Sequence, residues 1–140
     1  MLKFVATPSC KQQKNQLMTP IKSNQAAQEQ KSWERSLQFF KQENALLKYR
    51  LSEMVDISEG NGFLKLAEYF QTKLLQKDVK LEKLIKKLHA IAETFDQFSS
   101  CEIPGELLLQ QKQLREEVLQ IEKDFLVLSK EFNEKISQKI

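Results

Sequence analysis

Apolar residues recur along this chain at alternating intervals of four and three positions, and the central segment from Phe63 to Phe98 is the most regular. Ten of the eleven residues at this spacing are apolar, and the exception is Lys77. Such spacing averages 3.5 residues per turn, so these residues fall on one face of an α-helix, as in coiled coils, and we call such a row of residues a seam. The central seam is Phe63, Ala67, Phe70, Leu74, Lys77, Leu81, Leu84, Leu88, Ile91, Phe95 and Phe98.

Two flanking segments carry the same pattern, which predicts helices over about residues 24–59, 62–98 and 104–138. Ser23 or Asn24 would cap the first of these helices. The first seam is Trp33, Leu37, Phe40, Asn44, Leu47, Leu51 and Met54, and Phe39 and Leu46 are expected to widen it. The third is Leu107, Gln111, Leu114, Val118, Ile121, Phe125, Leu128, Phe132 and Lys135, widened by Leu108, Leu119, Leu126 and Ile136.

Short joints connect these segments. The first is Glu59-Gly60-Asn61-Gly62, in which glycine and asparagine tolerate the backbone of a tight turn. At the second joint, Pro104 suits the first turn of the third helix, where its missing N–H is not needed. Matched helix lengths and short joints predict an all-α fold, an antiparallel up-down-up three-helix bundle of long coiled-coil-like helices.

Charges predict how the second and third helices align. Lys73, Lys80 and Lys87 flank the central seam, and Glu131, Asp124 and Glu117 flank the third. In an antiparallel pair of helices the residue numbers of facing partners have a constant sum, and these three lysine–acid pairs each add up to 204. The same alignment pairs seam residues whose numbers add up to 202. The pairs are Leu74 with Leu128, Leu81 with Ile121, Leu84 with Val118, and Phe70 with Phe132. The first helix should dock on the more apolar flank, which carries Leu64, Ile85 and Ala92 against Leu108 and Ile136.

Two polar residues interrupt the seams at one level. The register places Lys77 opposite Phe125, with its ammonium reaching toward Glu122 or Asp124, and Asp78 lies nearby. Folding the first helix back brings Asn44 within one turn of them. Buried polar residues at seam positions usually fix register at some cost in stability, so we interpret this polar layer as structural, with a functional site as the alternative.

The charge of the chain is concentrated at its start. Residues 1–24 contain four lysines and no acidic residue, a local charge of +4 against a total of +3, which leaves residues 25–140 at −1. We expect residues 1–23 to form a flexible basic arm before a single domain at 24–140. The segment contains two Thr-Pro pairs, Thr7-Pro8 with Lys11 nearby and Thr19-Pro20-Ile21-Lys22. The second matches the minimal pattern of proline-directed kinases, although proline also simply keeps an arm extended.

The sequence offers little for catalysis. Cys10 and Cys101 are isolated, and His89 is the one histidine, expected at the edge of the core. We therefore predict no enzyme, no catalytic or cofactor residues, no metal site and no cofactor. Trp33 fits a packing anchor better than a binding residue. The lysines 73, 77, 80, 83, 86 and 87 could meet phosphates, but three of them face the acidic row of the third helix.

The segments Trp33–Leu51 and Leu66–Gln71 resemble small bacterial helical proteins whose function is uncharacterised. That resemblance implies a helical fold and no activity. Spectrin-type repeats are similar in plan, with three long helices and an early tryptophan, which is a similarity of architecture alone.

These observations favour a non-enzymatic interaction or scaffolding module that engages a protein partner. The alternative is a binder of nucleic acid or anionic membranes that acts through the basic arm. No apolar run approaches the eighteen or so residues of a membrane span, and we expect a cytoplasmic protein. A monomer is favoured because the three apolar seams can cover one another, and a homodimer is the other arrangement considered.

Overall fold

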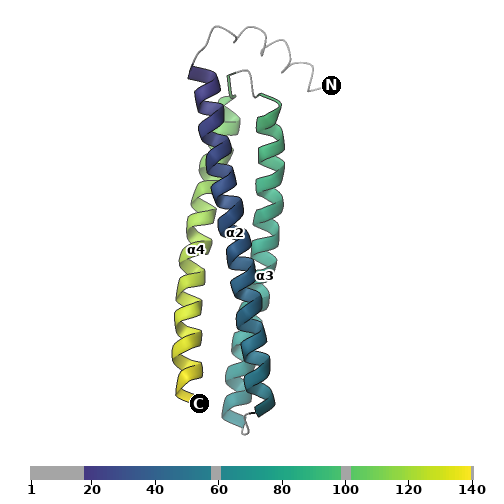
Figure 1. The fold of residues 1–140 in the computed structure, drawn as a ribbon, viewed down its shortest axis with the longest axis vertical. Coiled ribbons are helices and arrows are strands. Elements are labelled where there is room, and N and C mark those ends of the chain that lie inside the picture. The colour runs from purple at the N-terminus through teal and green to yellow at the C-terminus, as the bar shows by residue number, and fades with distance from the viewer. Residues whose placement is uncertain (1–17, 58–60, 99–101, 140) are drawn as a thin grey trace. The chain divides into compact units, whose positions relative to one another are not determined.

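In the computed structural model, residues 18–57, 61–98 and 102–139 are described, and they form three α-helices (Figure 1). These are α2 (Met18–Ile57), α3 (Asn61–Asp96) and α4 (Gly105–Lys139). No strand occurs in the described ranges. The predicted all-α class is therefore confirmed, and most helix ends fall within two residues of their predicted positions.

The start of α2 differs from the prediction. The helix begins at Met18, six residues before Asn24, so neither Ser23 nor Asn24 caps it, and the last part of the expected arm is helical. Pro20 is compatible with this because backbone N–H groups in the first turn have no helical acceptor. Thr19-Pro20 thus lies in a helical turn instead of an extended arm. Thr7 lies outside the described residues.

The joints between the helices involve the start and end of α3 and the start of α4. Asn61 and Gly62 of the predicted turn already belong to α3. The chain leaves α3 through two i→i+3 hydrogen bonds, from Gln97 N–H to the Thr94 carbonyl and from Phe98 N–H to the Phe95 carbonyl. Pro104 immediately precedes α4, and its carbonyl accepts the first bond from Leu108 N–H at 3.1 Å, so it flanks the helix instead of lying in its first turn.

The described residues divide into two compact units, and each helix contributes a segment to both. The first unit contains α2 up to Arg35 together with Ile85–Glu117. The second unit contains Ser36–Leu84 and the part of α4 from Val118 onward. Each unit is therefore a three-helix bundle with its own buried residues, and each is described below by itself.

In the second unit α2 and α3 run in opposite directions. Lys41 on α2 pairs with Glu82 on α3 at 2.6 Å, and Lys48, about two turns later on α2, pairs with Asp78, about one turn earlier on α3. Residue numbers rise along one helix as they fall along the other. The partners come from the flank of α3 that the sequence assigned to the docking of the first helix, so that assignment is confirmed here.

Helices α3 and α4 of the second unit are also antiparallel, in the predicted register. The rings of Phe70 and Phe132 lie 5.1 Å apart in an edge-on arrangement, and both side chains are fully buried. About two turns further along α3, Lys77 pairs with Asp124, which precedes Phe132 by about two turns of α4. The Phe70–Phe132 contact is one of the four predicted core pairs, and the six residues of the other pairs are all buried.

Helices α2 and α4 of the second unit run parallel. The ring of Phe40 lies 5.2 Å from that of Phe125, and Arg50 donates a hydrogen bond to the Asn133 side chain at 3.2 Å. Residue numbers rise together along this pair. The three pairwise directions therefore give the up-down-up order within this unit.

Most seam residues are buried as expected, although Met54 and Phe98 are only half-buried and Lys135 is exposed. The residues predicted to widen the seams are mostly not buried. Ile85 and Ile136 are buried, whereas Phe39, Leu46, Leu108, Leu119 and Leu126 are exposed, as is Leu64. Phe39 directly precedes buried Phe40, and neighbouring residues on a helix point about 100° apart. The flanks next to the seams are occupied by polar residues instead, so the prediction of wider apolar stripes is wrong at these positions.

Candidate functional site

The buried polar layer of the second unit begins with Asn44 of α2, which is fully buried. Its Nδ2 donates to the Asp78 carboxylate at 2.6 Å and to the Leu74 carbonyl at 2.8 Å, both on α3. Asp78 also accepts from Lys48, which holds this carboxylate against α2 from its outer side. The polar layer predicted from Asn44 and Asp78 is therefore present, and it ties α2 to α3.

One atom of this layer is not satisfied. Asn44 Oδ1 is buried and accepts no hydrogen bond from the described residues. An unpaired polar atom in a protein interior costs about 1–3 kcal/mol of folding free energy. Asn44 thus weakens the unit energetically while its two donor contacts restrict which level of α3 can face it.

Lys77 is the cationic member of the layer. Its side chain is only 11% exposed, and its Nζ lies 3.6 Å from Asp124 Oδ2, as the sequence register predicted. Burial lowers the pKa of Lys77 from its ordinary value; the nearby Asp124 carboxylate opposes this shift, and Lys80 and Lys73 add to it. Lys77 is therefore a largely desolvated ammonium with one carboxylate at salt-bridge distance.

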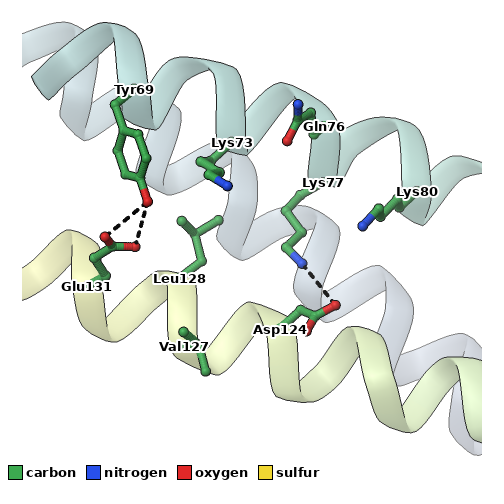
Figure 2. Close-up of a pocket in the computed structure, with 9 residues that line it drawn as sticks. All are labelled: Tyr69, Lys73, Gln76, Lys77, Lys80, Asp124, Val127, Leu128 and Glu131. Carbon is green, nitrogen blue, oxygen red and sulfur yellow. Dashed lines mark hydrogen bonds and ion pairs between the residues drawn. The ribbon is translucent and has the colours of Figure 1, made fainter. Parts of the chain in front are cut away.

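A cavity of about 390 Å³ opens beside Lys77 between α3 and α4 of the second unit. Figure 2 shows the lysines along α3, the Lys77 ammonium directed at Asp124, and the Tyr69 hydroxyl directed at Glu131. The cavity is lined by Tyr69, Lys73, Gln76, Lys77, Lys80, Asp124, Val127, Leu128 and Glu131.

The predicted ion pairs between α3 and α4 form only in part. Lys87 pairs with Glu117 at 2.8 Å in the first unit, as predicted. In the second unit Asp124 pairs with Lys77 instead of Lys80. Glu131 accepts from the Tyr69 hydroxyl at 3.1 Å instead of pairing with Lys73. The acidic row is thus engaged by Lys77 and Tyr69, and Lys73 and Lys80 remain at the rim of the cavity.

The first unit holds a polar cluster that the sequence pattern did not reveal. Gln30 and Gln111 are buried, and Gln30 Nε2 donates to Gln111 Oε1 at 2.8 Å. Gln111 in turn donates to Glu29, and Arg115 binds the same carboxylate through two hydrogen bonds of 2.6 and 2.8 Å. Gln111 was visible as a polar break in the third seam, but nothing in the sequence paired it with Gln30.

Glu29 is held in its charged form by this cluster. The hydrogen bond from Arg115 lowers the pKa of Glu29 most; burial opposes the shift, and Gln111 adds to it. The Arg115 guanidinium also lies 5.9 Å from the Trp33 ring centre. Trp33 itself is buried, in agreement with its role as a packing anchor.

His89 is exposed in the first unit, not at the core edge as predicted. Its Nε2 lies 2.7 Å from Glu34 Oε1, and both line a cavity of about 590 Å³. The lining contains no serine, threonine or cysteine that could serve as a nucleophile beside the imidazole. The described ranges contain no group of three or more residues able to hold a metal ion, and both cysteines lie outside them.

Two rows of exposed apolar side chains lie on the second unit. Phe39 and Leu46 are seven residues apart on α2, and Leu119 and Leu126 are seven apart on α4. The two rows flank the contact between α2 and α4: Asn133, seven residues beyond Leu126, accepts the hydrogen bond from Arg50, which follows Leu46 by about one turn. We call Phe39, Leu46, Leu119 and Leu126 the apolar rows.

Comparison of the chain with protein-family models, curated proteins and solved structures found no match in any of the three. Within the described residues, none of the helices is apolar over a sufficient length to cross a bilayer.

Replacing both Asn44 and Lys77 with leucine is expected to raise the free energy of unfolding by about 1–3 kcal/mol. The double variant removes the unpaired Asn44 Oδ1 and the desolvated ammonium. Asp78 and Asp124, which lose partners, are partly exposed and can be hydrated. Thermal and urea unfolding measure the change, with Lys80→Leu as the exposed control, and a lower midpoint for the double variant would refute the interpretation.

Light scattering of the same double variant should also show more self-association, because the polar layer no longer penalises other alignments of the helices.

Glu29→Gln should lower stability at neutral pH, and the loss should shrink on acidification. Because the folded-state pKa of Glu29 lies below its ordinary value, its contribution is complete above about pH 4.5 and is lost as pH falls through the folded-state pKa. Glutamine resembles the protonated carboxyl, so the two proteins converge in acid. Urea unfolding from about pH 7 to pH 3 measures the gap. Glu134→Gln is the exposed control, and a gap independent of pH would count against the Glu29–Arg115 account.

Proposed function

We propose that this protein is a non-enzymatic interaction module whose second unit binds an amphipathic helix of a partner protein. The apolar rows support the proposal. Four large apolar side chains, each 50% or more exposed, are arranged in two lines with heptad spacing. Scattered exposed leucines are ordinary on protein surfaces, but an ordered double row matches the way an amphipathic helix inserts its apolar face into a groove.

Charge indicates what kind of helix fits. Glu43 lies between Phe39 and Leu46 along α2, and Glu122 lies between Leu119 and Leu126 along α4, each within one turn of both neighbours. Arg50 and Lys123 lie equally close to the apolar rows, so this surface has two acidic and two basic residues and no excess of positive charge for nucleic acid or anionic lipid. It favours a partner helix that carries both acidic and basic residues beside its apolar residues.

A fluorescein-labelled amphipathic peptide of leucine, lysine and glutamate residues tests the apolar rows. The intact protein should bind it saturably, and the variant with Leu46→Asp and Leu126→Asp should bind at least about a hundredfold more weakly, because two buried leucine contacts are lost. Leu109→Asp is the matched control, since Leu109 in the first unit is 54% exposed and Leu46 is 51% exposed. Fluorescence anisotropy measures the affinities.

Two outcomes would contradict the proposal. One is equal peptide binding by the double variant and the Leu109→Asp control. The other is self-association of the intact protein that the double variant abolishes, because the apolar rows would then contact a second copy of the chain. If neither outcome is observed, comparison of the proteins captured from lysate by the double variant and by the control variant would identify the natural partner.

The alternative function rests on the four lysines of residues 1–24. A chain that binds nucleic acid or anionic membranes through this segment should lose binding when residues 1–17 are deleted, since the deletion removes Lys3, Lys11 and Lys14 and stops where α2 begins. Binding to duplex DNA, single-stranded RNA and phosphatidylserine vesicles, measured with and without the deletion at increasing salt, tests it. Absence of binding by the intact chain at low salt would exclude this alternative.

A further inference from the structure

The cavity between α3 and α4 of the second unit has a cation in its wall that its neighbours compensate poorly. An ammonium offers three hydrogen-bond donors, and the one acidic partner of Lys77 in the described residues is Asp124 at 3.6 Å. Only 11% of the side chain is exposed, so the cavity is the side from which further acceptors can reach the ammonium. A group that brought acceptor oxygens into the cavity would relieve this deficit.

Two more lysines face the same space. Lys73 precedes Lys77 by four residues and Lys80 follows it by three, so all three project from one side of α3 (Figure 2). The carboxylates in the lining are fewer, and Glu131 is already engaged by the Tyr69 hydroxyl. Three ammonium groups against two carboxylates leave a net positive charge around the cavity.

We propose that this cavity binds a small soluble molecule through its phosphate group, with Lys77 at the centre and Lys73 and Lys80 on either side. Phosphate oxygens accept several hydrogen bonds at once, and lysine is a common phosphate ligand in proteins. The volume of about 390 Å³ suits a small phosphorylated compound. Val127 and Leu128 provide an apolar wall for its organic part. This site is separate from the apolar rows and does not depend on the function proposed for them.

Inorganic pyrophosphate is the probe for a titration of the intact chain by calorimetry at constant ionic strength. Saturable one-to-one binding is expected, weakened at least tenfold by Lys77→Met, which fills the same space without charge. Lys86→Met is the matched control: it removes the same charge from an exposed lysine of α3 in the first unit and should leave the affinity unchanged. Asp124→Asn should tighten binding by removing the competing carboxylate, whereas Glu93→Gln should not.

Equal weakening by Lys77→Met and Lys86→Met would show only general charge attraction and would overturn the proposal. So would the absence of saturable binding by the intact chain. Vesicles of phosphatidylcholine with phosphatidic acid separate the two sources of a phosphate group. Binding to these vesicles without binding to pyrophosphate would overturn the assignment of a soluble ligand.

Discussion

Burial of the heptad seams is the constraint on which the rest of this structure depends. A seam at every third and fourth residue gives each helix one continuous apolar face, and within each unit three such faces cover one another. The Phe70–Phe132 contact sets the level at which α3 and α4 of the second unit meet. The positions of Lys77 at Asp124 and of the cavity beside them follow from that alignment. The polar groups select an alignment, while apolar burial supplies most of the free energy.

Much of this could be predicted because heptad periodicity constrains seam positions strongly. The levels of Phe70, Lys77 and Asn44 followed from the spacing of the seams together with the matched charges and the short first joint. Flanking positions were harder, because a heptad row says which side of the seam a residue occupies but not how closely the next helix approaches. Phe39 and Leu46 were therefore expected to face inward because they are apolar. Lys41 and Lys48 instead contact α3, because their long side chains can reach across the interface, and the spacing did not indicate these contacts.

The candidate sites lay largely beyond sequence reasoning for a related reason. A cavity depends on which side chains leave space between helices, and neither the Lys77 cavity nor the bond between Gln30 and Gln111 has a signature in either helix alone. The outcome of a competition between donors for one acceptor was also beyond sequence reasoning. Asp124 had candidates at Lys77 and at Lys80, and only the geometry of the interface decides between them.

The placement of Trp33 gives the first unit an optical signal of its own. It is the single tryptophan of the chain, and it is buried in the first unit near the Arg115 guanidinium. Both tyrosines, Tyr49 and Tyr69, lie in the second unit. Indole emission therefore senses one unit and tyrosine absorbance the other, although every helix runs through both. Whether the two spectroscopic transitions coincide on denaturation reveals whether helical continuity is enough to make the units melt as one.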